Sequence, residues 1–182
     1  MRVHPATGLL EGVRQVLSPH ADARPAGIAT DLIVVHNISL PPGEFAGPWI
    51  DRLFTGSLPR DVHPYFGEID GMRVSAHLLV RRDGEVVQFV PFHRRAWHAG
   101  ASQYEGRSAC NDFSIGIEME GTDETDFEPA QYAAAAQAIR ALLRAYPALA
   151  ASRIAGHSDI APGRKTDPGP RFDWQALRSQ LA

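Results

Sequence analysis

Four short runs of residues, each rich in β-branched or aromatic side chains, constrain the fold of this chain more than any other feature of its sequence. They predict strands over Asp31–Asn37, Met72–Val80, Glu85–Pro91 and Ser114–Met119. The tetrapeptide Arg81–Gly84 between the second and third runs ends in Asp-Gly, which favours a hairpin because glycine tolerates the positive φ of a tight turn. We therefore expect one sheet in which two strands are antiparallel neighbours.

Helical spacing of apolar residues is clearest over Pro129–Tyr146, where alanines dominate and the initial proline suits the first turn of a helix. Shorter helices are expected over Ala46–Phe54 and Phe172–Leu181. The resulting order of elements is strand, helix, strand pair, strand, helix, loop and helix. It predicts an α/β (α+β) fold in which a mixed central β-sheet is flanked by helices.

The composition predicts a single domain over residues 1–182. With 44% hydrophobic and 21% charged residues, the chain is long enough to bury one compact core. Its 18 basic and 21 acidic side chains are interspersed and give a net charge of -3. This pattern argues against nucleic acid as a partner, because phosphates require a basic stripe on the protein surface.

The beginning of the chain, MRVHPATGLLEGVRQVLSPH, lacks both the charged and the apolar region of a secretory signal. No stretch of the sequence approaches the roughly 18 apolar residues needed to cross a bilayer. The single cysteine, Cys110, has no partner for an internal disulfide, which suits a reducing compartment, and its expected role is packing. We therefore expect a cytoplasmic protein that is not attached to a membrane.

Two irregular stretches, Thr55–Gly71 and Ala155–Pro170, are rich in residue types that serve function. Long loops in small domains are disproportionately functional. The first stretch could close over a site as a lid, a question that the sequence leaves open. The second stretch carries His157 and, ten residues later, Asp167. Its prolines and glycines restrict the backbone and lower the entropic cost of holding these two side chains together.

His36 follows the run Leu32-Ile33-Val34-Val35, so a buried strand delivers its imidazole to the edge of the sheet. Together with His157 and Asp167 it would leave a tetrahedral zinc ion with one position open for water. A lone histidine at the end of a strand is more often a hydrogen-bonded structural residue, and Asp167 could equally cap a rigid turn. Spacing alone leaves the metal site and the structural interpretation open.

Glu118 shares one face of its predicted strand with Ser114 and Gly116, opposite the apolar face. A carboxylate beside a metal-activated water can accept a proton and return it to a leaving amine. Glu120 lies on the same face and is the competing candidate. Lys165 could offset the charge of a tetrahedral oxyanion, although a solvated loop lysine is the commoner case.

Six segments of the chain resemble one known family of enzymes, and the resemblance runs from about Ser18 to Trp174. They read HNISLPPGEF, HPYFGEI, VSAHLLVRRDGEVVQFVPF, RAWHAG, CNDFSIGIEMEG and GHSDIAPGRKTDPGPRFDW. These motifs resemble the zinc-dependent N-acetylmuramoyl-L-alanine amidases, a superfamily that includes phage-lysozyme-type amidases and peptidoglycan recognition proteins. Within it, the match is to the 1,6-anhydro-N-acetylmuramyl-L-alanine amidases. The resemblance implies an amidase-like fold with one zinc ion in an open groove.

Carried over to matching positions, the resemblance implies zinc ligands at His36, His157 and Asp167. It implies a catalytic glutamate at Glu118 and a lysine at Lys165 that stabilises the transition state. In this mechanism Glu118 takes a proton from water, the carbonyl is attacked, and the proton passes to the leaving nitrogen.

The same resemblance suggests which residues line the substrate groove: Asn37, Tyr65, Trp97 and His98. An indole such as Trp97 gives a large contact area at small entropic cost. One departure concerns Ala109, where related sequences carry arginine before the cysteine of the CND motif. Nearby Arg107 is a candidate to replace it.

The implied reaction is hydrolysis of the amide bond between the lactyl group of 1,6-anhydro-N-acetylmuramic acid and L-alanine. Its substrates would be cytosolic muropeptides handled during peptidoglycan recycling by a monomeric enzyme, and their removal would keep an inducible β-lactamase gene silent. One alternative is a broader amidase that acts on intact peptidoglycan. Another is a muropeptide-binding module without catalysis, as in superfamily members that have lost zinc ligands.

Overall fold

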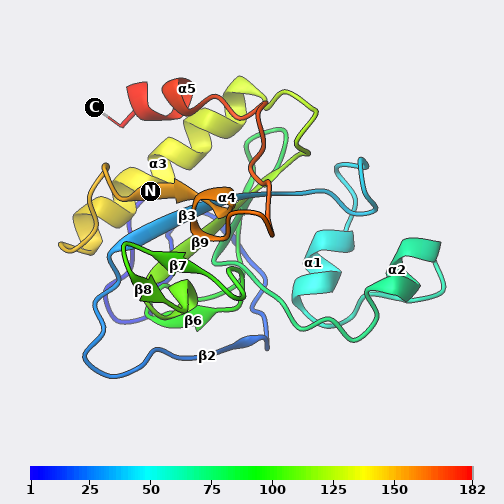
Figure 1. Ribbon diagram of the computed structural model, residues 1–182, viewed down its shortest axis with the longest axis horizontal. Coiled ribbons are helices and arrows are strands. Elements are labelled where there is room, and N and C mark those ends of the chain that lie inside the picture. Colours follow the sequence, from blue (N-terminus) through cyan, green and yellow to red (C-terminus); the bar gives the residue numbers. More distant parts are fainter. Residues whose placement is uncertain (182) are drawn as a thin grey trace.

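The structure, a computed structural model, describes residues 1–181 and is built around a six-stranded sheet (Figure 1). The strands of this sheet are β1 (Arg14–Gln15), β3 (Leu32–Ile38), β4 (Leu78–Val80), β5 (Val86–Gln88), β9 (Ser114–Glu120) and β10 (Ile154–Gly156). Their order across the sheet is β1-β5-β4-β9-β3-β10. All neighbours run parallel except β4 and β5. The predicted hairpin is therefore confirmed, and so is the predicted mixed sheet.

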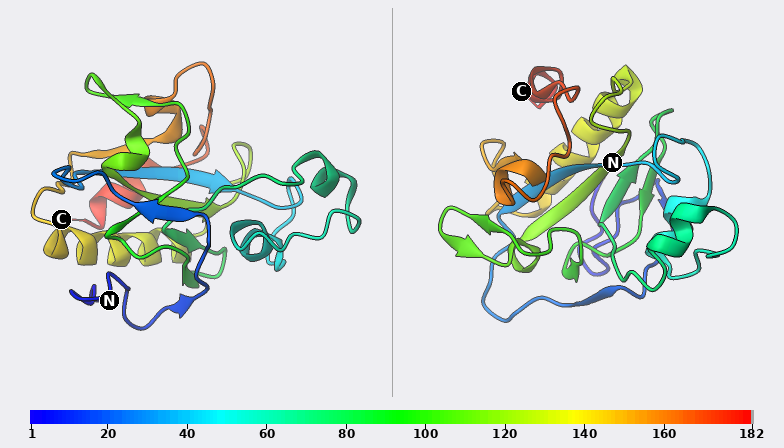
Figure 2. Two further views of the ribbon diagram at one scale, coloured as in Figure 1. Left: turned by 90° about the horizontal axis from the view of Figure 1, so that it is seen from below. Right: turned by 45° about the vertical axis from the view of Figure 1, so that its right-hand side comes forward.

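Helices lie against the sheet and beside it. They are α1 (Trp49–Phe54), α2 (Pro64–Glu68), α3 (Pro129–Ala145), α4 (His157–Ile160) and α5 (Trp174–Ser179), with a 3-10 turn η1 at Cys110–Asp112. Figure 2 shows α3 along one side of the sheet, while α1 and α2 extend from another. None of the helices within residues 1–181 has both the length and the hydropathy of a membrane span.

Two small sheets complete the molecule. They are formed by β2 (Ala21–Ala23) with β6 (Arg94–Ala96) and by β7 (Gln103–Tyr104) with β8 (Arg107–Ser108), and both pairs are antiparallel. They belong to the segments that cover the face of the main sheet opposite α3. Beside the carboxyl ends of the central strands, part of that face lines an open groove.

Strand β9 separates the apolar core from the polar face of the sheet. Ile115, Ile117 and Met119 are fully buried in the cluster that includes the alanines and leucines of α3. Glu118 and Gly116 alternate with them and point to the other face, as the period of two in a strand requires. The predicted division of this strand into two faces therefore holds.

The second and third predicted strands are shorter in the structure than the sequence indicated. The strand expected over 72–80 is regular only over Leu78–Val80, and the one expected over 85–91 ends at Gln88, although the Phe89 N–H still donates to the His77 carbonyl at 3.0 Å. Side chains interrupt the ladder: the Gly116 N–H donates to His77 Nδ1 at 3.0 Å instead of a strand carbonyl. The Ser75 N–H donates outside the sheet, to the Trp97 carbonyl at 3.2 Å. In both predicted strands, apolar residues continue in the sequence beyond the residues that form the regular strand.

The two stretches expected to be irregular contain short regular elements. Helix α2 lies within Thr55–Gly71, and β10 and α4 begin the stretch Ala155–Pro170. Strand β10 has only three residues and is defined by its parallel pairing with β3, which no local pattern reveals. The two short predicted helices, α1 and α5, are shorter than expected. Helix α5 starts only after Asp173, whose carboxylate accepts a hydrogen bond from the Ala176 N–H at 2.9 Å.

A buried ion pair joins the sheet to the segment that carries α1. Glu120 is 1% exposed, and its carboxylate accepts hydrogen bonds from Arg81 Nη1 at 3.2 Å and from the Ala46 N–H at 2.8 Å. The Arg81 guanidinium also donates to Asp51 of α1 at 2.7 Å. The Arg82 N–H donates to the second oxygen of Glu120 at 3.1 Å. Every oxygen of Glu120 is therefore engaged in holding this segment in place.

This pair predicts a large loss of stability on Arg81→Met. The substitution removes the countercharge of a buried carboxylate, which costs about 3 kcal/mol or more of unfolding free energy. The matched control is Arg82→Met, because Arg82 pairs with Glu128, which is 51% exposed, and such surface pairs are worth less than about 1 kcal/mol. Urea unfolding of the metal-free proteins measures both. Equal losses in the two variants would contradict the prediction.

Candidate active site

Three side chains from separate parts of the chain converge at the carboxyl ends of β3 and β10. His36 Nδ1 lies 2.9 Å from His157 Nδ1 and 3.1 Å from Asp167 Oδ2, and His157 Nδ1 lies 3.0 Å from the same oxygen. Among residues 1–181, this is the group of histidine, cysteine and acidic side chains that is arranged to hold a metal ion. The structure thus brings together the three residues that the sequence singled out.

Strand pairing explains how the two histidines meet. Strand β10 runs parallel to β3 with Gly156 opposite Val35. The residues that follow these two in the sequence are His157 and His36, so the histidines lie side by side. Gly156 also permits a close approach of the loop, because a Cβ at this position would lie 2.9 Å from Pro168 Cδ. The Ser158 N–H donates to the Asp167 carbonyl at 2.9 Å and holds the acidic residue beside the histidines.

Asn37 fixes the same loop from the opposite side. Its Nδ2 donates to the Pro168 carbonyl at 3.1 Å and to Asp123 Oδ1 at 2.7 Å. Both amide hydrogens are therefore used within the protein, and only the side-chain oxygen of Asn37 is left to face a ligand in the groove. Asp123, which also lines the groove, was missed by sequence reasoning, since it follows β9 in an exposed-looking turn with no distinctive motif.

The protonation states of the cluster suit a cation. Burial lowers the pKa of His36 to about 4, so its imidazole is neutral near pH 7. Burial alone would raise the pKa of Asp167, but hydrogen bonds with His157 and His36 outweigh it and hold that pKa far below its ordinary value of 3.8. Neutral imidazole nitrogens and an ionised carboxylate are the forms in which these side chains bind metal ions.

Glu118 lies directly beside the cluster because β9 pairs with β3 in a register that places it opposite His36. Its carboxylate is buried, and Oε2 has no hydrogen-bond partner among the described residues. Burial and the nearby charge of Asp167 raise the pKa of Glu118 well above 4.5, while Lys165 acts in the opposite direction. A carboxyl group with a raised pKa binds a proton more readily than an ordinary glutamate does, which suits a group that accepts a proton and gives it back.

Glu120, the competing candidate, lies two residues further along the same strand in a different environment. Both of its oxygens accept hydrogen bonds, and one forms the ion pair with Arg81. It does not line the groove that contains Glu118. The geometry therefore favours Glu118 as the proton acceptor.

An open groove of about 650 Å³ contains the cluster. All nine residues selected from the sequence line it: His36, Asn37, Tyr65, Trp97, His98, Glu118, His157, Lys165 and Asp167. Lys165 is exposed at the rim, and Tyr65 of α2 and Trp97 are partly buried. The lining residues include many that lie outside the cluster, so the groove extends beyond the three clustered side chains.

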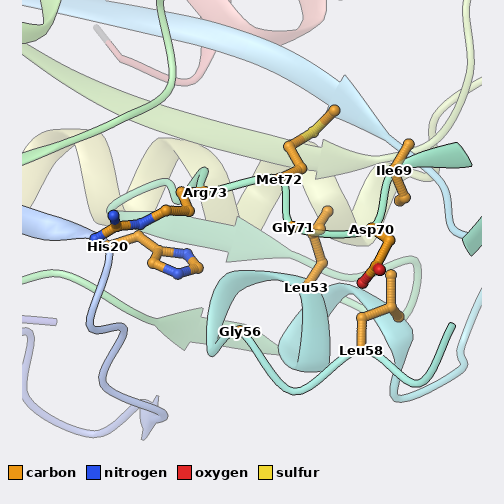
Figure 3. Close-up of a pocket in the computed structure, with 9 residues that line it drawn as sticks. All are labelled: His20, Leu53, Gly56, Leu58, Ile69, Asp70, Gly71, Met72 and Arg73. Atoms are coloured by element: carbon orange, nitrogen blue, oxygen red, sulfur yellow. The ribbon is translucent and has the colours of Figure 1, made fainter. Parts of the chain in front are cut away.

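A smaller pocket of about 290 Å³ adjoins the groove (Figure 3). The two cavities share Leu53, Ile69 and Met72 in their walls. His20 stacks on Trp97 with ring centroids 6.0 Å apart, and the Arg73 guanidinium lies 5.4 Å from the centroid of the indole. Two side chains therefore pack near the ring of Trp97, which supports its use as a rigid platform.

The region around Ala109 differs from what the sequence suggested. Arg107 does not replace a missing arginine in the groove, because it pairs with Asp31 at 2.9 Å and lies over the Phe113 ring at 3.9 Å. Neither Arg107 nor Ala109 lines the groove. Ala109 adopts a left-handed backbone with φ 58°, which starts the turn leading to Asn111.

The groove contains a carboxylate that can accept a proton and, beside it, a potential metal centre. This arrangement is typical of hydrolases that cleave amides. Comparison with known proteins gives the same class. A sequence model of the family described as N-acetylmuramoyl-L-alanine amidase matches residues 26–170. The chain therefore belongs to the N-acetylmuramoyl-L-alanine amidase family, and the resemblance of its motifs to that family is confirmed.

Individual relatives agree along the whole chain. The 1,6-anhydro-N-acetylmuramyl-L-alanine amidase AmpD of Escherichia coli (strain K12) is 61% identical over 171 residues, which cover 94% of this chain and 93% of that protein. The crystal structure of an AmpD selenomethionine derivative matches with a TM-score of 0.95 at 57% identity, covering 98% of this chain and 99% of that one. A complex of the E. coli amidase AmiD with anhydro-N-acetylmuramic acid-L-Ala-D-gamma-Glu-L-Lys matches with a TM-score of 0.60 at 29% identity, covering 86% of this chain and 60% of that one.

The raised pKa of Glu118 predicts a pH-dependent effect of Glu118→Gln on the metal-free protein. Below about pH 4.5 the carboxyl is protonated in both folded and unfolded chains. As the pH rises, the unfolded chain loses this proton while the folded chain retains it, so the contribution of Glu118 to stability falls. The glutamine variant has no such loss. Relative to the original protein, it gains about 1.4 kcal/mol for each unit by which the pKa is raised.

Urea unfolding in the presence of a chelator, repeated between pH 4 and pH 8, measures this difference. Asp167 interacts with Glu118, so the difference between the two proteins reports the titration of Glu118 together with its coupling to Asp167. A difference between the variant and the original protein that stays constant over this range would show that Glu118 has an ordinary pKa.

Proposed function

We propose that this protein is a zinc-dependent amidase that hydrolyses the bond between the lactyl group of 1,6-anhydro-N-acetylmuramic acid and L-alanine in muropeptides. The observation that carries the proposal is the convergence of His36, His157 and Asp167 beside the unpartnered carboxylate of Glu118. The name of the E. coli relative AmpD supports the substrate, as does the muropeptide bound in the AmiD complex. The groove that runs past the cluster has room for both a sugar and a peptide stem.

The donor set fits one zinc ion. Zinc binds imidazole nitrogen and carboxylate oxygen at about 2.0–2.2 Å, so two ligands of a tetrahedral site lie about 3.3 Å apart. The three donor atoms are separated by 2.9, 3.1 and 3.0 Å, and a shift of a few tenths of an ångström would meet that geometry. Two imidazoles and one carboxylate also match catalytic zinc sites, which have three protein ligands and one open position.

The reaction adds water across the amide, so a C–O bond forms while the C–N bond breaks. A bound zinc ion supplies a Lewis acid that acidifies water to a pKa of about 7 and polarises a carbonyl. Glu118 accepts the proton of the attacking water and returns it to the leaving nitrogen of L-alanine. The Lys165 ammonium, at the rim of the groove, faces the negative charge that develops on the carbonyl oxygen.

Substrate contacts are assigned to the remaining walls of the groove. Trp97 offers a flat apolar surface for the sugar or the stem, and Tyr65 of α2 lines the same groove. Asn37 offers an acceptor oxygen, so its partner on the substrate is an N–H or O–H donor. We further propose that residues 1–182 form one amidase domain, active as a monomer in the cytoplasm. There it recycles anhydro-muropeptides, and their removal keeps an inducible β-lactamase gene silent.

His157→Ala is expected to abolish stoichiometric zinc binding and hydrolysis together, since it removes one of three protein ligands. Zinc is measured by atomic absorption after dialysis, and activity is followed by release of the L-alanine-headed peptide from an anhydro-muropeptide. His93→Ala is the matched control, because His93 is exposed and lies outside the groove. An His157→Ala protein that keeps both zinc and activity would defeat the ligand assignment.

Glu118→Gln is expected to retain zinc and to lose turnover by about a hundredfold or more, because the amide cannot shuttle the proton. Glu120→Gln provides the comparison at the neighbouring glutamate of the same strand. Its stability should fall, because Arg81 loses its ionised partner, while turnover per folded molecule stays near that of the original protein. The opposite pattern of turnover in these two variants would assign proton transfer to Glu120.

A further inference from the structure

The ring of His98 lies between the proposed zinc ligand His36 and the buried hydroxyl of Ser114. Its Nδ1 is 2.9 Å from His36 Nε2, and its own Nε2 is 3.1 Å from Ser114 Oγ. The rings of His36 and His98 meet edge to face, with centroids 5.0 Å apart. Both nitrogens of His98 are thus occupied inside the protein, although this residue was selected from the sequence as a substrate contact.

The direction of these hydrogen bonds follows from the cluster. His36 presents Nδ1 to His157 and Asp167, so this nitrogen must carry no proton when it binds a metal ion. The proton of the neutral ring then sits on Nε2, which donates to His98 Nδ1. The single proton of neutral His98 consequently sits on its Nε2 and is donated to Ser114 Oγ. One arrangement of protons therefore satisfies both hydrogen bonds, from His36 to His98 and from His98 to Ser114.

The second histidine of the cluster is held by the next residue of the same segment. His157 Nε2 lies 3.1 Å from the Ala99 carbonyl, the counterpart of the contact between His36 and His98. Consecutive residues thus supply the outer acceptor for each of the two imidazoles. Ligating histidines commonly have such partners, which fix the tautomer and the orientation of the ring.

Contacts inside the protein hold the segment that contains His98 and Ala99. Asn111 Oδ1 accepts the backbone N–H groups of His98 at 3.1 Å and Ala99 at 2.8 Å. Gly116 makes room for the ring, because a Cβ there would lie 2.5 Å from His98 Cγ. Ser114 is fully buried at the start of β9. The position of His98 is therefore set by the strand and the turn beneath it.

We propose that His98 is a positioning residue of the metal centre: backed by Ser114, it fixes the tautomer and orientation of His36, while the Ala99 carbonyl does the same for His157. The inference rests on the proposed zinc function. It separates His98 from Trp97, its neighbour in the chain, which remains the substrate platform.

The first experiment compares His98→Phe with the original protein and with His93→Phe, a matched control at an exposed position outside the groove. Phenylalanine fills the site but offers no acceptor to His36. Zinc affinity, measured by competition with a chromogenic chelator on folded protein, should fall about 10- to 100-fold in His98→Phe. It should not change in His93→Phe. An unchanged zinc affinity in His98→Phe, with a raised KM for an anhydro-muropeptide, would make His98 a substrate contact and overturn the inference.

The second experiment uses Ser114, which is fully buried and separated from the groove by His98. Ser114→Ala should weaken zinc binding severalfold, and Ser114→Thr, which retains the hydroxyl, should restore it. Unfolding of the metal-free variants in urea reports any general loss of stability separately. Equal zinc affinity in the alanine and threonine variants would contradict a role for the hydroxyl in orienting His98.

Tautomers give a test that needs no variant and no activity. Long-range proton–nitrogen-15 spectra of the zinc-loaded protein should show both His36 and His98 protonated on Nε2. An Nδ1-protonated His98 would overturn the proposed direction of the hydrogen bonds. Original protein that binds no zinc would overturn the proposed function and this inference together. Zinc binding that is indifferent to His98 and Ser114 would overturn the inference alone.

Discussion

The parallel pairing of β3 with both β9 and β10 is the constraint on which the rest of the structure depends. Parallel neighbours bring their carboxyl ends to the same edge of a sheet, where open α/β sheets bind their ligands. The register places Glu118 opposite His36 and ends β10 beside Val35, so that His157 follows next to His36. A shift of either strand by one residue would turn its functional side chain toward the apolar core. Because α3 packs on that core, this packing also determines which side chains of the strands face the groove.

Burying several polar groups close together is energetically unfavourable. Hydrogen bonds from the surrounding residues offset this cost and restrict the motion of the buried side chains. Burial keeps His36 neutral, while hydrogen bonds keep Asp167 ionised. Asn37 and the backbone of Ser158 hold the loop that carries Asp167. The cluster is thus formed before a ligand arrives, which reduces the reorganisation that binding would otherwise require.

Much of the frame could be predicted from sequence because its elements have a local period. Strands β3 and β9 and helix α3 fall within a residue or two of their expected bounds. Strand β10 could not be predicted, since its three residues become a strand only through a partner some 120 positions away in the chain. For the site, spacing left the metal cluster undecided, and the motifs favoured it. The contacts of Asn111 and Asp123 could not be predicted from local sequence, because Asn111 accepts from the His98 N–H and Asp123 from the Asn37 side chain, partners that only folding brings near.

Glu118 and Glu120 show how far the surroundings, and not the residue type, determine what a side chain does. They share a strand, a face and a nearly complete loss of solvent. Glu120 meets Arg81 and two backbone N–H groups, so its charge is satisfied and its use is structural. Glu118 meets the charge of Asp167 and has an oxygen without a partner, so its proton is held more tightly and remains available for transfer. The strand supplies two identical carboxyl groups, and the arginine on the hairpin after β4 makes only one of them suitable for proton transfer.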